Sequence, residues 1–197
     1  MFSKNIYPYL IAEVGNSHEG NFKLCKKSII EAKRGGANCV KFQLFNHKTI
    51  VNPKLRTIKH ANSKFKFQFE RFKSIELNLR KVKILSKIAK KNKIDFSVSV
   101  FDPDLVSPVS KHVSFFKVAS GDLNYIDLLK EIKKTKKKAI LSTGMANVEE
   151  IQNAIKILGK KNWEILHCIS KYPTNNNELN LNSIPFLKKK LKMNIGF

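Results

Sequence analysis

Two lysines stand inside apolar runs of the sequence, where a charge is costly. Lys117 lies in FFKVASGD, and Lys41 lies in CVKFQ, two residues before Gln43. Residues two apart on a strand share a face, so Lys41 and Gln43 form a polar pair suited to an anionic ligand. A buried lysine needs a partner, so Lys117 meets either a phosphate or carboxylate ligand or, alternatively, Glu13 or Asp122 in an internal salt bridge.

Two turns rich in hydroxyl groups follow apolar runs further along the chain. They are Ser-Gly-Asp at 120–122 and Ser-Thr-Gly-Met at 142–145. Hydroxyls beside a glycine that opens the backbone suit phosphate oxygens. Ser-Gly is also ordinary loop chemistry, so the prediction of an anion site depends on the two turns and the two lysines together.

Short apolar runs alternate with longer amphipathic stretches, and this order must position those side chains. The pattern predicts strands at 9–14, 39–42, 94–100, 115–119, 139–142 and 163–167, with a seventh beginning at 193–197. Helices are expected at 21–34, 77–91, 103–112, 126–134, 148–158 and 183–191, and a long irregular stretch at 46–73. Strands that alternate with crossover helices indicate an α/β fold with a parallel sheet.

Polar side chains end each of the six complete strands. They are Glu13, Lys41, Gln43, Ser99, Lys117, Ser120, Ser142, His167 and Ser170. In a (β/α)₈ barrel all strand ends meet at one mouth, whereas a doubly wound sheet gathers such residues at one switch point. Contributions from six successive strands favour a TIM-barrel type fold, truncated after about six βα units, and neither GxGxxG nor a P-loop is present.

The composition excludes several classes of protein and leaves one alternative open. The 197 residues include 38 Lys and Arg against 15 Asp and Glu, a formal net charge of +23. The apolar share of 42% is too high for a disordered basic tail. Only four of the cations are Arg, which makes nucleic acid an unlikely partner and points to a lysine-rich coding bias. A basic polyanion-binding protein stays open as the alternative function.

Cysteine and histidine usage predicts no metal site within the chain. Cys25, Cys39 and Cys168 lack CxxC spacing and are expected to be small buried hydrophobes in a reducing, cytoplasmic compartment. No apolar run is long enough for a membrane span, and no signal peptide is evident. His18 and His167 are expected to be hydrogen-bonded structural residues. The other histidines, His47, His60 and His112, have no acidic or histidine neighbour at ligand spacing.

Five segments, distributed along most of the chain between residues 11 and 174, carry a family resemblance. They are IAEVGNSHEG (11–20), AKRGGANCVKFQ (32–43), FFKVASGDLNYIDLL (115–129), AILSTGMANVEEI (139–151) and LHCISKYPT (166–174). They resemble the N-acetylneuraminate (sialic acid) synthases and relatives that make legionaminic and pseudaminic acids. The resemblance implies a barrel enzyme of carbohydrate biosynthesis that condenses phosphoenolpyruvate with an N-acylated hexosamine such as N-acetylmannosamine, forming a nonulosonic acid and releasing phosphate.

The resemblance also implies roles for individual residues. The phosphoenolpyruvate-binding positions are matched by Lys41, Ser99, Lys117, Ser120, Ser142 and Ser170. The positions facing the amino sugar are matched by Gln43 and Tyr172. Glu13, Lys41 and Asp122 match catalytic positions, with Glu13 near the metal and the sugar's reacting end and Asp122 nearest the reacting enol carbon.

Two positions depart from the family pattern. Asp122 stands where the family usually has Glu, one methylene longer, and the STPF motif reads SVSVF here, so Ser99 keeps a hydroxyl where Thr is usual. A displacement of about 1 Å can cost roughly 10²-fold in rate, so Asp122 is expected to alter rate or substrate.

The resemblance further implies that residues 1–197 are the N-terminal part of a larger enzyme. The last barrel strands and a C-terminal antifreeze-like domain are then absent, and the histidines that bind Mn²⁺ or Mg²⁺ lie beyond residue 197. The whole protein is expected to be a cytoplasmic homodimer. The fragment alone is expected to be inactive and prone to aggregation, because an incomplete barrel leaves strand edges unpaired.

Overall fold

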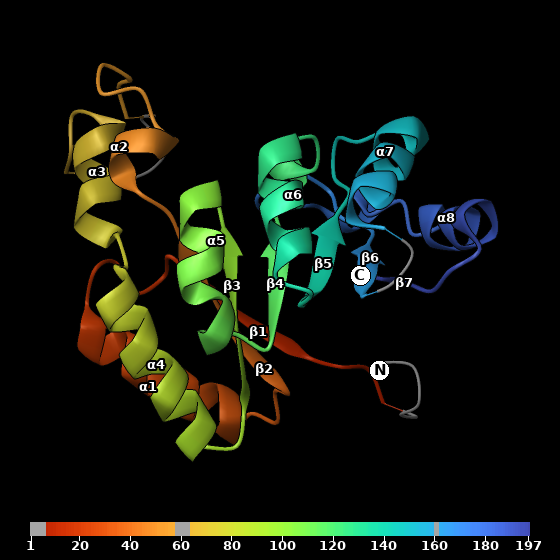
Figure 1. The fold of residues 1–197 in the computed structure, drawn as a ribbon. Helices are drawn as coiled ribbons and strands as arrows, with labels where there is room; N and C mark the ends of the chain where they lie inside the picture. The colour runs from red at the N-terminus through yellow and green to blue at the C-terminus, as the bar shows by residue number, and fades with distance from the viewer. Residues whose placement is uncertain (1–6, 58–63, 160–161) are drawn as a thin grey trace. The chain divides into compact units, whose positions relative to one another are not determined.

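The computed structural model describes residues 7–57, 64–159 and 162–197 (Figure 1). The chain forms two compact units that divide between Ser114 and Phe115. Within each unit strands alternate with helices, and every pairing between the strands described below is parallel. The α/β class predicted from the sequence is therefore confirmed.

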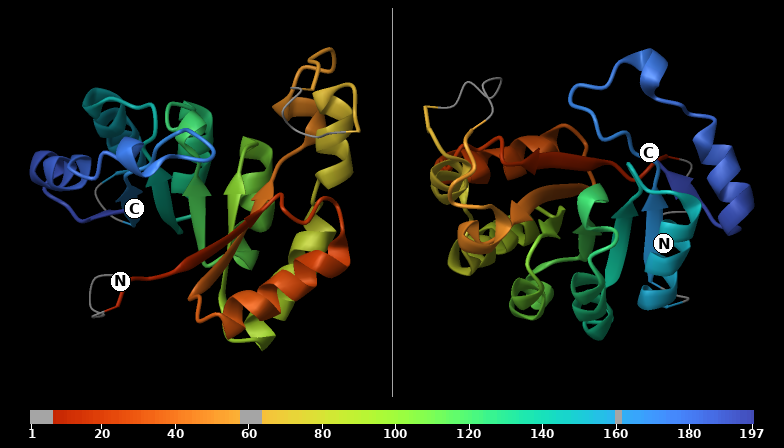
Figure 2. Two further views of the ribbon diagram at one scale, coloured as in Figure 1. Left: turned by 180° about the vertical axis from the view of Figure 1, so that it is seen from behind. Right: turned by 90° about the horizontal axis from the view of Figure 1, so that it is seen from above.

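The first unit pairs its strands in chain order, β1–β2–β3. Its elements are β1 (Ile11–Gly15), α1 (Phe22–Arg34), β2 (Cys39–Leu44), α2 (His47–Ile50), α3 (Gln68–Ile75), α4 (Leu79–Lys91), β3 (Asp95–Val100), α5 (Pro103–Val109) and the 3₁₀ turn η2 (Ser110–His112). Helices α1 and α4 lie side by side next to these strands, as Figure 2 shows from behind.

The second unit pairs β4–β5–β6–β7, again in chain order. Its elements are β4 (Phe115–Val118), η3 (Ser120–Asp122), α6 (Ile126–Lys134), β5 (Lys138–Ser142), α7 (Val148–Leu158), β6 (Trp163–Leu166), η4 (Asn176–Glu178), α8 (Ser183–Leu191) and β7 (Ile195–Gly196). Helices α6 and α7 are neighbours, and α8 contacts β7. The predicted seventh strand is thus present as a short strand at the end of the chain.

Strands β2 and β3 of the first unit and β4 and β5 of the second are almost entirely buried, which explains their nearly continuous apolar sequences, whereas β1 and β6 are mostly half-buried. Cys39, Val40 and Phe42 of β2 are fully buried, and so is Phe116 of β4. The helices contribute apolar stripes, for which Val82, Leu85 and Ala89 of α4 are an example. Polar groups on these strands are therefore exceptions that require partners.

Side-chain caps set the start of several helices. Asn21 accepts hydrogen bonds from the backbone N–H groups of Lys23 and Leu24 at the start of α1. Asn78 caps α4 and Asp102 caps α5 in the same manner. These short polar side chains satisfy N–H groups that have no partner within the helix. The α4 cap also explains why this helix begins at Leu79 and not at residue 77.

The stretch 46–73 was expected to be irregular, and this expectation is wrong in part. Helix α2 occupies the start of the stretch, and α3 begins at Gln68. The ring of Phe72 in α3 packs edge-on against Phe45 with centroids 5.2 Å apart. Phe69, Phe72 and Ile75 recur every three residues along α3, so the sequence does carry a short helical apolar stripe there, which the prediction of an irregular stretch overlooked. Residues 58–63, including His60, lie outside the described residues.

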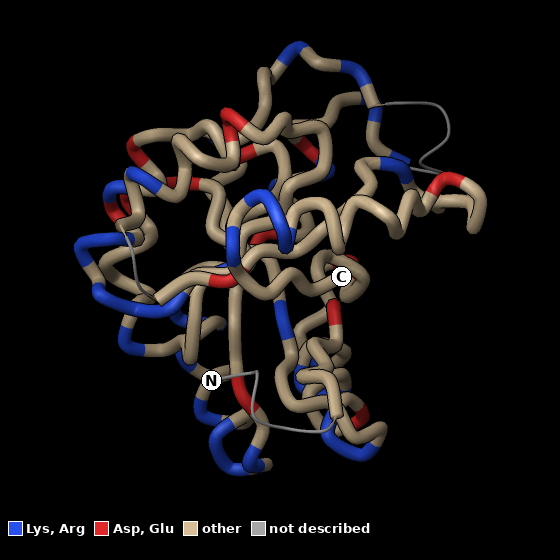
Figure 3. Tube along the Cα trace, turned by 90° about the vertical axis from the view of Figure 1, so that its right-hand side faces the viewer, with Lys and Arg blue, Asp and Glu red and all other residues tan. Residues whose placement is uncertain are grey.

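Lysine and arginine are spread along the trace of both units (Figure 3). Within the described residues, no helix is both long and apolar enough to cross a membrane. Closure into a (β/α)₈ barrel and truncation after six units stay predictions.

The capping box of α7 gives a test of the second unit's stability. Asn147 Oδ1 accepts from the Glu150 N–H at 2.9 Å, and Glu150 Oε2 accepts from the Asn147 N–H at 2.8 Å. Replacing Asn147 by Ala removes the side-chain acceptor and should lower the free energy of unfolding by about 1 kcal/mol. Urea denaturation measures the change.

The matched control is Asn153→Ala, in the exposed middle of the same helix. This variant should be neutral or slightly stabilising, because alanine favours helix and no cap is lost. Equal destabilisation by the two substitutions would contradict the role of the capping box.

Candidate functional site

Lys41 is the centre of a polar cluster in the first unit. The residue is only 6% exposed, like its apolar neighbours on β2, although its side chain carries a charge. Its Nζ donates a hydrogen bond to Ser99 Oγ on β3 at 2.9 Å and forms an ion pair with the carboxylate of Glu13 on β1. The strand pairing puts Glu13 directly opposite Lys41. The Glu13 side chain is 51% exposed, so the cluster reaches solvent through this carboxylate.

Gly15 brings Gln43 into the same cluster. Its φ of +51° lies in the left-handed region, and a Cβ there would be 3.0 Å from Glu13 Oε1 and 3.5 Å from Gln43 Nε2. Gln43 Oε1 accepts a hydrogen bond from Asn16 Nδ2 at 2.5 Å. Glycine therefore gives both the backbone conformation and the space that this approach requires.

Lys117 repeats the arrangement in the second unit. The residue is 7% exposed, and its Nζ donates to the carbonyl of Val118 at 2.8 Å and to Ser142 Oγ on β5. In both units, then, a buried lysine donates to a serine on the next strand. The sequence left two salt-bridge partners open for Lys117. Glu13 is paired with Lys41 instead. The positive charge of Lys117 lowers the pKa of Asp122, although burial raises that pKa more.

The turn after β5 collects two further hydroxyls around Gly144. The N–H of Gly144 donates to Ser120 Oγ at 3.1 Å. A Cβ at this position would be 2.9 Å from Ser120 Oγ and would overlap Ser170 Oγ. The structure thus brings Ser120 and Ser170 to one glycine, and a larger residue would displace them.

Asp122 is a half-buried carboxyl in the 3₁₀ turn η3. Its Oδ2 is buried and has no hydrogen-bond partner among the described residues. Burial raises the pKa of Asp122 from its ordinary value of 3.8 to about 6, and the Lys117 charge opposes this effect without cancelling it. A carboxyl of this kind exchanges its proton close to neutral pH.

Tyr172 was expected to face the amino sugar, but its side chain is in solvent. The residue is 97% exposed and follows β6 in a loop where Lys171 forms an ion pair with Glu178. The structure therefore does not bring Tyr172 together with the other predicted residues of the second unit.

His18 and His167 agree with the structural role expected for them. His18 is 1% exposed, and its Nδ1 accepts from the Gly20 N–H at 3.1 Å. Burial lowers the His18 pKa, and the charge of Lys81 adds to the effect. His167 Nε2 lies 2.9 Å from the carbonyl oxygen of Leu179. Among the described residues no group of three or more His, Cys, Asp or Glu side chains forms a metal site.

Two contacts were missed by sequence reasoning because their partners are distant in the chain. His47 Nδ1 lies 2.6 Å from Glu76 Oε2, so this histidine has an acidic neighbour in space. Cys168 was expected to be buried like Cys25 and Cys39, but it is only partly buried and its Sγ lies 3.0 Å from Ser142 Oγ. The position of Cys168 just after β6, the strand next to β5, was the only available signal.

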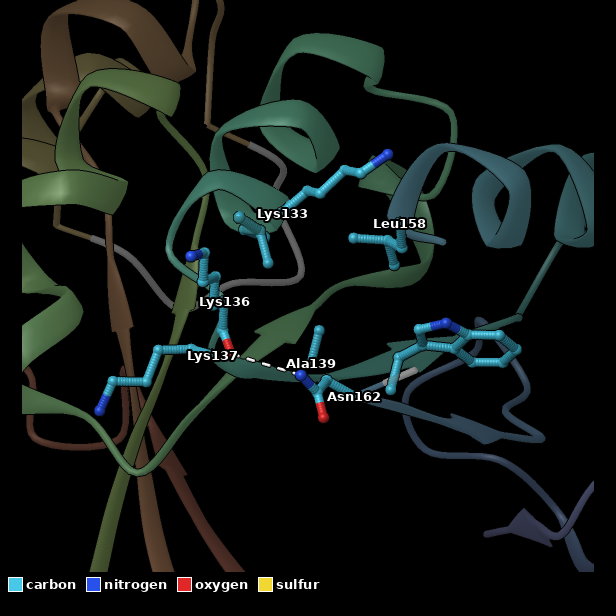
Figure 4. Close-up of a pocket in the computed structure, with 8 residues that line it drawn as sticks. Lys133, Lys136, Lys137, Ala139, Leu158 and Asn162 are labelled. Carbon is cyan, nitrogen blue, oxygen red and sulfur yellow. Dashed lines mark hydrogen bonds between the residues drawn. The ribbon is translucent and has the colours of Figure 1, made fainter. Parts of the chain in front are cut away.

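A shallow cavity of about 130 Å³ lies elsewhere in the second unit (Figure 4). It is lined by Ile132, Lys133, Lys136, Lys137, Ala139, Leu158, Asn162 and Trp163. These residues belong to the amino ends of β5 and β6 and to the adjoining helix ends. The predicted site residues follow the carboxyl ends of the strands, so this cavity is not part of their clusters.

Comparison with known proteins identifies the family. Residues 28–197 match the model of the NeuB family. The chain is 36% identical over 197 residues to an N,N'-diacetyllegionaminic acid synthase of Campylobacter jejuni, covering 95% of this chain and 59% of the relative. It is 37% identical to an uncharacterized protein of Methanocaldococcus jannaschii, covering 96% of this chain and 54% of the relative.

A solved structure shows the same likeness in three dimensions. The N-acetylneuraminic acid (sialic acid) synthetase of Leptospira borgpetersenii, crystallised with citrate, is 30% identical and superposes with a TM-score of 0.82. The match covers 96% of this chain and 64% of that one. The chain spans about half the length of the curated relatives it matches. On the match over residues 28–197, the chain belongs to the NeuB family.

Proposed function

We propose that the whole protein condenses phosphoenolpyruvate with an N-acylated hexosamine to give a sialic or other nonulosonic acid plus phosphate. The observation that carries this proposal is the arrangement in the second unit, where buried Lys117 donates to Ser142 and two further hydroxyls adjoin Gly144. Relatives named as acid synthases support the same reaction class.

The second unit has the chemistry of a phosphate-binding site. A phosphate dianion is stabilised by a fixed ammonium group and by hydroxyl donors that are already oriented. Lys117 and Ser142 supply this pair, and Ser120 and Ser170 offer hydroxyls at the adjoining turn. We assign the phosphate of phosphoenolpyruvate to these groups.

The first unit supplies a second buried cation and an exchangeable carboxylate. Lys41 is paired with Glu13 and with Ser99 Oγ. An anionic substrate at Lys41 would replace Glu13 as its partner, and the released carboxylate would be free to accept a hydrogen bond or a proton from the sugar. Gln43 then acts as a neutral donor and acceptor for sugar hydroxyl or amide groups.

Asp122 is the proton-exchanging group in this proposal. Its raised pKa lets it give or take a proton near neutral pH, as general acid–base catalysis requires. The enol carbon of phosphoenolpyruvate attacks the sugar aldehyde, water adds at the adjacent carbon, and phosphate leaves. The proton transfers that accompany these steps are assigned to Asp122 and Glu13.

The proposal includes Mn²⁺ or Mg²⁺, a cytoplasmic location and a homodimer, all of which the family resemblance implies. The described residues do not fit a metal ion by themselves, because they form no cluster of three or more His, Cys, Asp or Glu side chains. The steps above are therefore derived for the protein side chains only.

The direct test is the phosphate released when the whole protein is incubated with phosphoenolpyruvate, an N-acylhexosamine and Mn²⁺. We expect stoichiometric phosphate and nonulosonic acid.

Lys117→Met should weaken phosphoenolpyruvate binding at least about tenfold, because charge-assisted hydrogen bonds contribute about 1.5–3 kcal/mol. The control Lys130→Met changes an exposed lysine of α6 and should leave binding unchanged. No phosphate release with any N-acylhexosamine, together with steeply salt-dependent RNA binding, would support the polyanion-binding alternative instead.

Gly144 allows a test whose control is the same substitution, glycine to alanine, at a nearby uncrowded position. In Gly144→Ala the new methyl group must displace the Ser120 and Ser170 hydroxyls, so phosphoenolpyruvate affinity should fall about tenfold. Gly121→Ala adds the same methyl group where no atom lies within 4 Å and should bind normally. Calorimetric titration measures both variants. Normal binding by Gly144→Ala would remove this turn from the proposed site.

The Asp122 carboxyl predicts a pH dependence of folding stability. Its folded pKa of about 6 is above the ordinary value of 3.8, so the folded state holds this proton more tightly than the unfolded state. The resulting stabilisation is fully present below about pH 4 and is lost as the pH rises towards 6. Asp122→Asn should lack this component.

Denaturant unfolding between pH 4 and pH 7 measures the difference between the two proteins. Asp127→Asn, with a 75% exposed side chain on α6, is the matched control and should keep the wild-type pH profile. If the wild type and Asp122→Asn had parallel profiles, Asp122 would not be the perturbed carboxyl described above.

A further inference from the structure

The exposed face of helix α4 in the first unit consists almost entirely of cations. The exposed residues of this helix are Arg80, Lys83, Ile84, Lys87, Lys90 and Lys91. They recur at helical spacing and form one stripe along α4, opposite the buried stripe of Val82, Leu85 and Ala89. The sequence of α4 contains no acidic residue that could pair with them.

A lysine-rich coding bias does not account for this face by itself, because such a bias acts on the whole chain. Helices α1 and α4, which lie side by side (Figure 2), carry eleven Lys and Arg against one acidic residue, a net charge of +10. Helices α6 and α7 carry four Lys against four Asp and Glu, a net charge of zero. The one acidic residue of the α1–α4 pair, Glu31, is itself ion-paired with Arg34 at 3.1 Å.

The charges of α4 also stand where they lower the stability of the helix. The helix dipole favours cations in the last turn, but Arg80 and Lys81 occupy the first turn, where it favours acidic residues. Lys83 and Lys87 are four residues apart, a spacing at which like charges repel. Helix stability therefore does not explain these cations, whereas an anionic partner would.

The 3₁₀ turn η2 extends the basic face of α4. Ser86 Oγ in α4 donates a hydrogen bond to the carbonyl of His112 in η2 at 2.7 Å. Burial lowers the pKa of His112, and the positive charges of Lys111, Lys83 and Lys87 lower it further. These three lysines therefore lie close enough to act on one imidazole group, and their charges gather over a single region of the surface.

Helix α1 adds cations and exposed aliphatic side chains. Lys33 Nζ in α1 donates to the carbonyl of Lys93, just after α4, at 3.0 Å, so the basic carboxyl ends of the two helices meet. Leu24 and Ile30 of α1 are 40% and 43% exposed, and Ile84 within the cationic stripe of α4 is 40% exposed. The surface thus combines positive charge with aliphatic groups.

This combination fits an anionic lipid bilayer better than a nucleic acid. Proteins recognise nucleic acids with arginine forks and with aromatic rings that stack on bases. The exposed residues of α1 and α4 include two arginines and no aromatic ring. Lysines near an anionic bilayer are attracted to its surface potential, and aliphatic side chains gain free energy at the boundary between headgroups and acyl chains.

We propose that the exposed faces of α1 and α4, together with η2, dock the protein on the surface of a bilayer rich in anionic phospholipid. The ammonium groups contact headgroup phosphates, and Ile84 enters the boundary between headgroups and acyl chains. The docking is peripheral, since the apolar stripe of α4 stays in the protein core. The residues of the proposed catalytic site are not part of this surface, so the docking does not rest on the proposed function.

The first experiment is co-sedimentation of the whole protein with vesicles. The protein should bind vesicles made of equal parts phosphatidylglycerol and phosphatidylcholine and should not bind pure phosphatidylcholine. Binding should fall steeply as the salt concentration rises, because salt screens charges at a surface. Failure to bind the anionic vesicles at low salt, or equal binding to both kinds of vesicle, would overturn the proposal.

Charge reversal locates the binding surface. The double variant Lys83→Glu, Lys87→Glu should weaken vesicle binding at least about tenfold. The matched control Lys130→Glu, Lys156→Glu changes the net charge equally on α6 and α7 and should weaken it less than about threefold. Equal losses would mean that net charge alone acts and would remove α4 from the docking surface. Circular dichroism checks that both variants fold, and phosphate release without vesicles should be unchanged in both.

The substitution Ile84→Ser separates a bilayer from a nucleic acid as the partner. It removes an aliphatic group from the stripe and should weaken vesicle binding about threefold, because the buried apolar area contributes to binding at a bilayer. Ile126→Ser, on the exposed start of α6, is the control and should bind normally. RNA binding that is weakened by the Lys83, Lys87 double variant but not by Ile84→Ser, without vesicle binding, would assign the face to nucleic acid and contradict the proposal.

Discussion

Burying a lysine within a parallel sheet is the constraint on which the polar architecture of this protein depends. A strand covered on both faces has no water for an ammonium group, so each charge must meet an acceptor on a neighbouring strand. Lys41 meets Ser99 and Glu13, and Lys117 meets Ser142. Each of these partners lies on a strand paired with the strand of the lysine, so the register of the strand pairing determines which acceptor each ammonium group reaches.

The same constraint accounts for what the sequence could and could not predict. Apolar periodicity and lysines inside apolar runs were sufficient to predict the strands, the helices that cover them and the residues that carry charge. Ser142 and Gly144 were recognised as one turn, because they are adjacent in the chain. The contact of Cys168 with Ser142 depends instead on which side chains meet across two strands, and no periodicity in a single segment contains that information.

The errors have separate physical causes. Helix α3 has only eight residues, so the helical spacing of Phe69, Phe72 and Ile75 is a short signal, and tertiary contacts such as the packing of Phe72 against Phe45 stabilise the helix. Tyr172 was assigned by family resemblance, which carries a residue type and not its exposure; its ring lies in solvent, and its role facing the amino sugar stays a prediction. The assignment of Asp122 came from the same resemblance, and its unpartnered oxygen and raised pKa give that position a physical character of its own.

The ion pair of Lys41 with Glu13 would affect the release of an anionic ligand from Lys41 as well as its binding. A buried cation whose only counter-charge is the ligand would be left uncompensated whenever the ligand departs, and this would slow dissociation. Here a carboxylate on the adjacent strand can re-form the pair as an anion leaves. Arrival and departure then become an exchange of one negative partner for another. In the function proposed above, an exchange of this kind would keep affinity moderate and favour rapid turnover over tight retention of product.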